Sequence, residues 1–242
     1  MNPKDQLYAQ QKKLVQAFRF DDEVAKVFAD MIRRSVPGYP MMLDMLGVVA
    51  KRHVQANSHC YDLGCSLGAS TLAIRQNIQQ PGCKIIAVDN SAAMTSRCRQ
   101  VITNDSATTP VDVICEDILA LAFAPLSLAS MNLTLQFIAK DQRLPLLRRI
   151  AGATLPGGVL FLSEKLRFDD AFEQDELTEL HHQFKKHQGY SALEIAQKRT
   201  AIENVLIPET LASHQQRLLE AGYSKVITAL QCFNFVTLIA YK

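Results

Sequence analysis

The amino-acid sequence predicts an α/β fold in which a mostly parallel sheet carries helices on both faces. Short apolar runs alternate with segments of helical periodicity, which is the pattern of successive βα units. Asp62, Asp89 and Asp117 lie near the carboxyl ends of three successive predicted strands and are 27 and 28 residues apart, about the length of one such unit. The composition, 48% hydrophobic and 21% charged, is that of an ordinary globular protein.

Two helices are expected before the sheet, as an N-terminal helical cap over residues 1–55. The first covers 21–34, where apolar residues recur at i, i+3, i+4 and i+7. The string S-V-P-G-Y-P at 35–40 ends it, because proline and glycine interrupt regular structure. The second helix is expected over about 41–53 and leads into the core.

The predicted core, residues 56–165, alternates strands with helices. The strands are apolar runs bounded by turn residues, at 58–63, 84–88, 111–115, 130–137 and 159–163. The helices are expected from the glycines after the first strand to about 79, at 92–103 and at 141–153. Because ligands of open α/β sheets bind at the carboxyl ends of the strands, we expect the site at that edge.

The alternation stops after residue 165. Residues 166–215 are charged and helical in composition, and predict a helical insertion. The last region, 216–242, contains two β-rich runs at 225–232 and 234–240, which predict an antiparallel hairpin at the edge of the sheet. The chain, 1–242, is therefore predicted to be a single domain.

Charge and cysteine spacing exclude several classes of protein. The 26 Lys and Arg nearly balance the 24 Asp and Glu, so no electrostatic signature of nucleic-acid or membrane-surface binding is present. The N-terminus is polar and no apolar stretch reaches membrane-spanning length. The six cysteines form no C-x-x-C pair and match no zinc or disulfide pattern, so we interpret several of them as small buried hydrophobes. A reduced, cytoplasmic protein is expected.

The string D-L-G-C-S-L-G at 62–68 lies between the first core strand and a helix. Gly64 and Gly68 permit a sharp turn and the close approach of a ligand. The following helix offers free backbone N–H groups. Asp89 comes 21 residues after Gly68, where it can accept hydrogen bonds from ribose hydroxyls. The loop therefore predicts a nucleoside-binding site.

Two other interpretations of this loop stay open. G-x-S-x-G also matches the nucleophile elbow of α/β-hydrolases, with Ser66 as nucleophile. Its candidate partners lie in polar helical segments, at His181, His182, His187 and His214. The second alternative is a glycine-rich turn that binds nothing. An NAD site is disfavoured, because G-x-G-x-x-G is missing.

The loop resembles the first motif of Rossmann-like, S-adenosylmethionine-dependent enzymes. That resemblance implies a seven-stranded, mostly parallel sheet whose terminal hairpin supplies the antiparallel seventh strand. It implies that Asp89 binds ribose and that Asp117 and Ile118 contact adenine.

Nine strings resemble a narrower family, the carboxy-S-adenosyl-L-methionine synthases. They follow one another from about residue 21 to the end of the chain, and the last three lie outside the shared cofactor core. The strings are R-S-V-P-G-Y (34–39), Y-D-L-G-C-S-L-G (61–68), C-K-I-I-A-V-D-N-S (83–91), T-P-V-D-V-I (109–114), L-T-L-Q-F (133–137), L-S-E-K (162–165), E-I-A-Q-K-R (194–199), E-N-V (203–205) and Q-C-F-N-F (231–235).

This resemblance implies that carboxylate, not methyl, is transferred. Such enzymes convert S-adenosylmethionine and prephenate to carboxy-S-adenosylmethionine and phenylpyruvate, the carbon dioxide from prephenate being captured by a sulfonium ylide. The product serves a separate enzyme that carboxymethylates a hydroxyuridine at the tRNA wobble position, giving 5-oxyacetyluridine. The resemblance implies a homodimer. Because capture of carbon dioxide by a ylide needs no metal, none is expected, and the balanced charge predicts no direct contact with nucleic acid or membrane.

The family's binding positions carry over one by one, with Arg199 and Tyr39 as the catalytic candidates. The binding residues implied are Tyr39, Gly64, Cys65, Ser66, Asp89, Asn90, Asp117, Ile118, Asn132 and Arg199. Arg199 would repel a methyl sulfonium but would pair with a carboxymethyl group through two charge-assisted hydrogen bonds. Without the resemblance, Lys198 and Arg199 suggest a solvated helix face. Tyr39 would either close over the ligand or be a surface aromatic of its turn, and Asn132 would bond either the amino-acid end of the ligand or nearby backbone groups.

Three further interpretations follow from the residues. The histidines at 181, 182 and 187 lie on a charged helix and are expected to face water rather than bind metal. A small-molecule methyltransferase would use the same nucleoside loop without needing Arg199. A non-catalytic nucleoside-binding partner in tRNA modification would keep Asp89 and tolerate the loss of Arg199.

Overall fold

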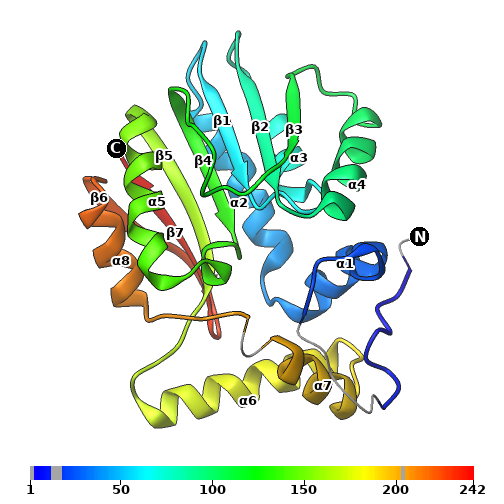
Figure 1. Cartoon of the computed structure of the whole chain (residues 1–242). Coiled ribbons are helices and arrows are strands. Elements are labelled where there is room, and N and C mark those ends of the chain that lie inside the picture. The colour runs from blue at the N-terminus through cyan, green and yellow to red at the C-terminus, as the bar shows by residue number, and fades with distance from the viewer. Residues whose placement is uncertain (1–2, 12–17, 203–204) are drawn as a thin grey trace.

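A sheet of seven strands organises the chain (Figure 1). The computed structural model describes residues 3–11, 18–202 and 205–242, so that 203–204 of the string E-N-V lie outside the described residues. Across the sheet the strand order is β3-β2-β1-β4-β5-β7-β6. The strands are β1 (His59–Leu63), β2 (Lys84–Asp89), β3 (Val111–Cys115), β4 (Leu126–Asn132), β5 (Thr154–Lys165), β6 (Lys225–Cys232) and β7 (Phe235–Tyr241).

The first five strands are parallel and β7 is antiparallel to both β5 and β6. This confirms the predicted fold class and the terminal hairpin, with β6 at one edge of the sheet. Ile85 and Ile86 of β2 point to opposite faces and join different apolar clusters. Because the inner strands are buried on both faces, they read in the sequence as continuous apolar runs.

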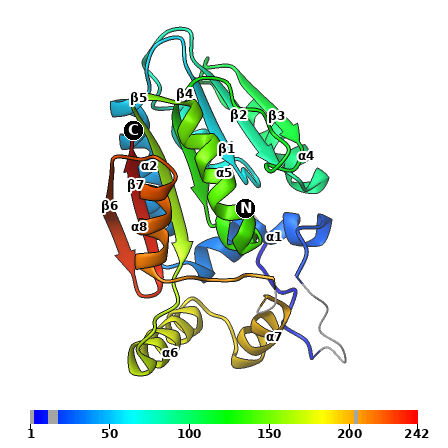
Figure 2. The ribbon, with the colours of Figure 1, turned by 60° about the vertical axis from the view of Figure 1, so that its left-hand side comes forward.

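Helices cover both faces of the sheet (Figure 2). The helices are α1 (Asp22–Ser35), α2 (Tyr39–His53), α3 (Ala69–Arg75), α4 (Ala92–Thr103), α5 (Lys140–Ala153), α6 (Ala171–His187), α7 (Ala192–Ile202) and α8 (Leu211–Glu220). One apolar cluster packs α5 and α8 on one face, and two others pack α2, α3 and α4 on the other.

Beyond the carboxyl ends of the strands, α1 from the N-terminal region lies with α6 and α7 from the insertion (Figure 1), and these three helices are called the cap from here on. Asp21 begins α1, because its carboxylate accepts the backbone N–H of Val24 at 3.0 Å. Phe18, Met94 and Ala201 share one buried cluster, which packs the cap against α4. The cap is therefore fixed to the core by apolar packing.

Residues 3–11 are tied to the connection between α6 and α7. Asp5 is 1% exposed, and its carboxylate accepts the hydroxyl of Tyr190 at 2.6 Å. Arg34 donates to the carbonyl of Gln188 at 2.8 Å, and its guanidinium lies 3.8 Å from the centre of the Tyr190 ring. Buried polar networks of this kind specify one arrangement, and this one fixes the connection that leads into α7.

Sequence analysis was wrong about the fourth strand, which lies at 126–132 rather than 130–137. Residues 126–131 are all buried, so the strand lacks the polar alternation that would have marked its start. Leu133 has a left-handed φ of +60°, and the 3-10 turn η1 (Leu135–Phe137) follows. The apolar run therefore continues past the true end of the strand.

Three other boundaries differ from the expectation. β5 covers 154–165 instead of 159–163, so that the predicted Pro-Gly-Gly turn lies inside the strand. The helix after β1 ends at Arg75 instead of about 79. Within the predicted insertion 166–215, α6 and α7 lie in the cap, whereas α8 packs on α5 and β6 against the sheet.

Four cysteines, Cys60, Cys65, Cys83 and Cys98, are buried as expected, but Cys115 is exposed. Within the described residues, every helix is too short or too polar to traverse a membrane.

Candidate active site

A cavity of about 700 Å³ lies between the carboxyl edge of the sheet and the cap. Its volume is within the usual range for small-molecule sites, roughly 300–1,000 Å³. The structure brings all ten predicted binding residues together on its lining; they are Tyr39, Gly64, Cys65, Ser66, Asp89, Asn90, Asp117, Ile118, Asn132 and Arg199. Their roles toward a ligand stay predictions.

The loop after β1 owes its glycines to packing as well as to its turn. Gly64 and Gly68 have φ values of +84° and +89°, which only glycine adopts without strain. A Cβ on Gly64 would lie 2.2 Å from Oγ1 of Thr134, and one on Gly68 would lie 2.9 Å from Sγ of Cys98. The two glycines were expected to permit a sharp turn and the approach of a ligand, and the structure adds their close contacts with Thr134, just before η1, and with α4.

Asp89 is held in place at the end of β2 by the backbone. The N–H groups of Ser66 and Ser91 each donate to one of its carboxylate oxygens, both at 2.9 Å. Burial raises the pKa of Asp89, and these two hydrogen bonds oppose that rise by favouring the anion. Each oxygen keeps a lone pair for a further donor, so the carboxylate can accept two hydroxyl groups of a ribose.

Asn132 is already bonded at both ends of its amide. Its Nδ2 donates a hydrogen bond to Oγ of Ser70 at 2.7 Å, and its Oδ1 accepts a hydrogen bond from the hydroxyl of Ser163 at 3.0 Å. One donor and one acceptor position remain for a ligand.

Asp62 lies deeper than Asn132 and is 1% exposed. Its carboxylate accepts hydrogen bonds from the hydroxyl groups of Thr71 at 2.6 Å and Ser130 at 2.9 Å. Burial raises the pKa of Asp62 to about 6.

Beyond β3, Asp117 and Ile118 present contrasting groups to the cavity. The Asp117 carboxylate accepts the N–H of Leu119 at 2.9 Å and is exposed, whereas Ile118 is buried. A polar acceptor beside an apolar wall suits a flat heterocycle with an exocyclic amine. The geometry is thus compatible with the adenine contact that the resemblance implies.

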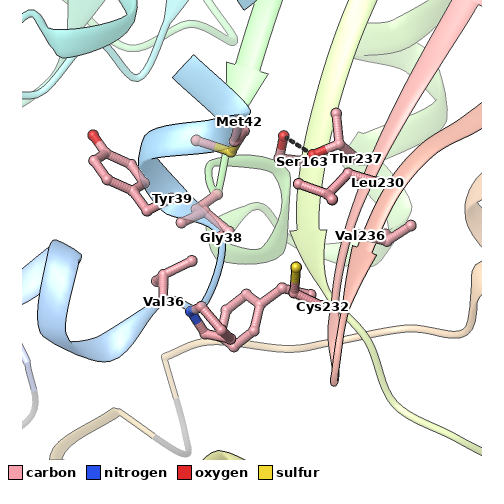
Figure 3. A pocket seen from close by; sticks show the side chains of 12 residues that line it. Val36, Gly38, Tyr39, Met42, Ser163, Leu230, Cys232, Val236 and Thr237 are labelled. Carbon is pink, nitrogen blue, oxygen red and sulfur yellow. Dashed lines mark hydrogen bonds between the residues drawn. The ribbon is translucent and has the colours of Figure 1, made fainter. Parts of the chain in front are cut away.

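Tyr39 begins α2, directly after the left-handed Gly38. A Cβ on Gly38 would lie 2.8 Å from Sγ of Cys232, so the turn before α2 rests on the terminal hairpin. Figure 3 shows the Tyr39 ring pointing away from Cys232 and from the bonded pair Ser163 and Thr237. Burial raises the pKa of Tyr39 well above its usual value, so the phenol stays neutral.

Arg199 lies on α7 and faces the cavity from the cap. The side chain is exposed and has no hydrogen bond or ion pair with any residue that the structure describes. Three lysines from β5, α6 and α7 line the same cavity, at Lys165, Lys185 and Lys198. The sequence did not indicate these lysines as lining residues, since Lys185 and Lys198 lie in charged helical segments and Lys165 ends a strand.

The expectation that three histidines of α6 face water was wrong for His181. It is 5% exposed, and its Nε2 lies 2.7 Å from the carbonyl oxygen of Ser35. Burial lowers its pKa to about 2, so the ring is neutral. His182 is half-buried and lines the cavity, and His187 is exposed. In the described part of the chain, no group of three or more His, Cys, Asp or Glu is arranged to hold a metal.

Ser66 lacks the environment of a hydrolase nucleophile. Its hydroxyl donates to Sδ of Met94 at 3.5 Å rather than to a histidine. Nucleophile and base must be within hydrogen-bond reach of each other in that mechanism. The hydrolase interpretation therefore has no support from the described residues.

Comparison with known proteins identifies close relatives. A family described as "Methyltransferase domain" matches residues 61–158. The chain is 55% identical to the carboxy-S-adenosyl-L-methionine synthase of Marinobacter nauticus, over 98% of this chain and 95% of that protein. It is 57% identical to the enzyme of the same name from Pseudomonas putida strain GB-1, over 98% and 97% of the two chains.

Solved structures share the fold at low identity. A putative O-methyltransferase from Nostoc punctiforme superposes with a TM-score of 0.64 at 15% identity, over 91% of this chain and 59% of that one. Human N-acetylserotonin methyltransferase, solved with S-adenosylmethionine, gives a TM-score of 0.60 at 16% identity, over 91% and 55%. These likenesses confirm the Rossmann-like, methyltransferase-type fold.

Proposed function

This chain belongs to the carboxy-S-adenosyl-L-methionine synthase family, and we propose that it makes carboxy-S-adenosylmethionine from S-adenosylmethionine and prephenate. It is a transferase. The proposed carboxyl donor is prephenate, and the other product is phenylpyruvate. The chain works as a cytoplasmic homodimer, and its product supplies a separate tRNA carboxymethyltransferase.

The reaction balances without a metal or a redox partner. The ring C–CO₂⁻ bond of prephenate breaks and the ring becomes aromatic as its hydroxyl leaves. A proton leaves the sulfonium methyl and combines with that hydroxyl as water. The resulting ylide carbon forms a new bond to the released carbon dioxide. The methyl group becomes a carboxymethyl group, whose carboxylate needs a cationic partner.

The observation that carries the proposal is the position of Arg199. It meets the same cavity as Asp89, although the two residues come from the cap and the sheet. Its guanidinium has no ion pair with a described residue, so it is available to a ligand. A guanidinium can bind a carboxylate through two parallel hydrogen bonds, whereas it would repel an unmodified sulfonium.

A prephenate-dependence assay tests the proposal. Incubated with S-adenosylmethionine alone, the protein should leave the methyl group untransferred. Added prephenate should yield phenylpyruvate and a nucleoside product heavier by one carbon dioxide, in equal amounts. Methylation of an acceptor without prephenate would instead support a small-molecule methyltransferase, the alternative favoured by the match of residues 61–158. Nucleoside binding without any product would support a non-catalytic partner in tRNA modification.

A further inference from the structure

Three basic side chains at one end of the cavity have no anionic partner within the described part of the chain. Lys165 ends β5, Lys185 lies on α6 and Arg199 lies on α7, and all three line the cavity. Lys165 and Lys185 are half-buried. None of the three side chains forms a hydrogen bond or an ion pair with any residue in 3–11, 18–202 or 205–242. Partly buried, unpaired charges are costly unless a ligand neutralises them.

Lys198 differs from these three because it is already engaged. Its ammonium donates to Oγ of Ser35 at 3.0 Å and lies 5.6 Å from the centre of the Tyr190 ring. Asp5 and Asp30 also act on it electrostatically. Lys198 therefore belongs to the buried network that fixes α7, and it is not counted with the ligand-facing cations.

The acidic lining residues lie at the other end of the cavity. Asp89, Glu116 and Asp117 follow β2 and β3, whereas Lys165 ends β5. In the sheet order, β1 and β4 separate β2 from β5. With strands about 4.8 Å apart, β2 and β5 are roughly 14 Å apart at this edge. The acids are thus placed to serve the nucleoside, and among the residues that the structure describes the two lysines have no counterion.

Mutual repulsion among the cations supports this description. Burial lowers the pKa of Lys185 to about 7, and Lys165, Lys198 and Arg199 add to the effect. Burial and the charge of Arg199 also lower the pKa of Lys165. Of the neighbouring histidines, His181 is neutral, and burial and Lys185 lower the pKa of His182, whose Nδ1 lies 3.7 Å from a carboxylate oxygen of Glu179. An anion bound among these groups would relieve the repulsion.

We propose that Lys165 and Lys185 form the binding subsite for the carboxylate that prephenate keeps, next to the Arg199 site for the carboxylate that is transferred. The inference rests on the proposed function, in which the second substrate is a dicarboxylate. One of its carboxylates becomes the carboxymethyl group and needs Arg199. The other remains on the pyruvyl side chain of phenylpyruvate and needs a second cationic site. The two lysines, one at the end of β5 and one on α6, supply that second site.

Binding measurements without turnover test the subsite. Prephenate is titrated by calorimetry into protein saturated with S-adenosylhomocysteine, which lacks the reactive methyl group. Lys165→Met and Lys185→Met should each weaken prephenate binding about tenfold or more. Affinity for S-adenosylhomocysteine should stay within about twofold of wild type. Lys185→Arg should restore most of the loss, because it keeps the charge.

Lys186→Met is the matched control. Lys186 is the next residue on α6, is exposed and does not line the cavity, so its loss should leave both affinities unchanged. Unchanged prephenate affinity in the two lysine variants would overturn the proposal. An equal loss for S-adenosylhomocysteine would also overturn it, because the lysines would then hold the methionine carboxylate of the nucleoside.

The same experiment separates this inference from the proposed function. If the wild type binds prephenate through the two lysines but forms no product, the carboxyl-transfer reaction is wrong and the subsite stands. If the wild type forms product while Lys165→Met and Lys185→Met keep its KM for prephenate, the reaction stands and the subsite is wrong. Thermal unfolding followed by circular dichroism verifies that each variant is folded.

Discussion

The two ends of the cavity are built in different ways. At the nucleoside end, after β1, β2 and β3, the Asp89 carboxylate is bonded by backbone N–H groups before any ligand arrives. At the cationic end, Lys165, Lys185 and Arg199 come from a strand end and two cap helices and have no partner among the described residues. The first end is a property of the fold, whereas the second requires a ligand to balance its charge.

Loss of Arg199 should produce the largest difference between the affinities for the carboxylated nucleoside and for S-adenosylmethionine. Arg199→Leu should cost the carboxylated nucleoside about 3–4 kcal/mol of binding free energy, because its new carboxylate loses a bidentate partner. S-adenosylmethionine, which lacks that carboxylate, should lose little. Arg199→Lys should restore binding in part. Calorimetric titration of both ligands measures the difference, and equal losses for the two would return Arg199 to a structural role.

Loss of Asp89 should weaken the binding of S-adenosylmethionine and of its carboxylated form to the same extent. Asp89→Ala removes an acceptor that the backbone has positioned, at a cost of about 2–3 kcal/mol in binding free energy. S-adenosylmethionine and its carboxylated form should lose the same amount, because the ribose is common to both. Unchanged affinities would show that Asp89 does not contact the ribose.

The nucleoside end should also be sensitive to packing. Gly64→Ala places a Cβ against Thr134 at a φ of +84° and should lower the free energy of unfolding by about 1–3 kcal/mol. Gly152→Ala is the control, since its Cβ would meet nothing within 4 Å in α5. It should be neutral or stabilising by up to about 1 kcal/mol. Urea unfolding compares them; similar losses in both variants would contradict this account of the loop.

Prephenate binding at the cationic end should depend on pH, with a smaller effect than the substitutions above. The pKa of Lys185 is lowered to about 7 by burial and by Lys165, Lys198 and Arg199. The ammonium is therefore present at lower pH and is lost as pH rises through that value, so KM for prephenate should increase. Lys185→Arg should flatten this increase, because a guanidinium stays charged. Steady-state kinetics from mildly acidic to alkaline pH measure it, and a profile that Lys185→Arg leaves unchanged would count against Lys185.

Most of the fold could be predicted because its signals are local. The apolar runs and the glycine loop at 62–68 each indicate a βα unit, and Asp89 directly follows the predicted strand 84–88. The position of β4 was missed because Leu126 to Met131 are buried on both faces, while the positive φ of Leu133 ends the strand inside an apolar run. Nothing in the residue types marks that turn.

The cationic end could be predicted only in part. Arg199 was found by resemblance, since a basic residue on a polar helix otherwise suggests a solvated face. Lys165 and Lys185 lie on different elements, and only the placement of α6 against α1 and α7 in the folded chain brings both lysines to one cavity. The one usable signal was a lysine ending a buried strand at the carboxyl edge. The burial of His181 had no local signal at all, because it depends on the carbonyl of Ser35 in α1.

The origin of the transferred carbon tests the central claim most directly. Prephenate labelled with ¹³C in its ring carboxylate is incubated with S-adenosylmethionine and the enzyme, and both products are analysed by mass spectrometry. The proposed reaction places the label in the carboxymethyl group of carboxy-S-adenosylmethionine and leaves phenylpyruvate unlabelled. A carboxylated nucleoside without label, or label found only as free bicarbonate beside unchanged S-adenosylmethionine, would contradict it.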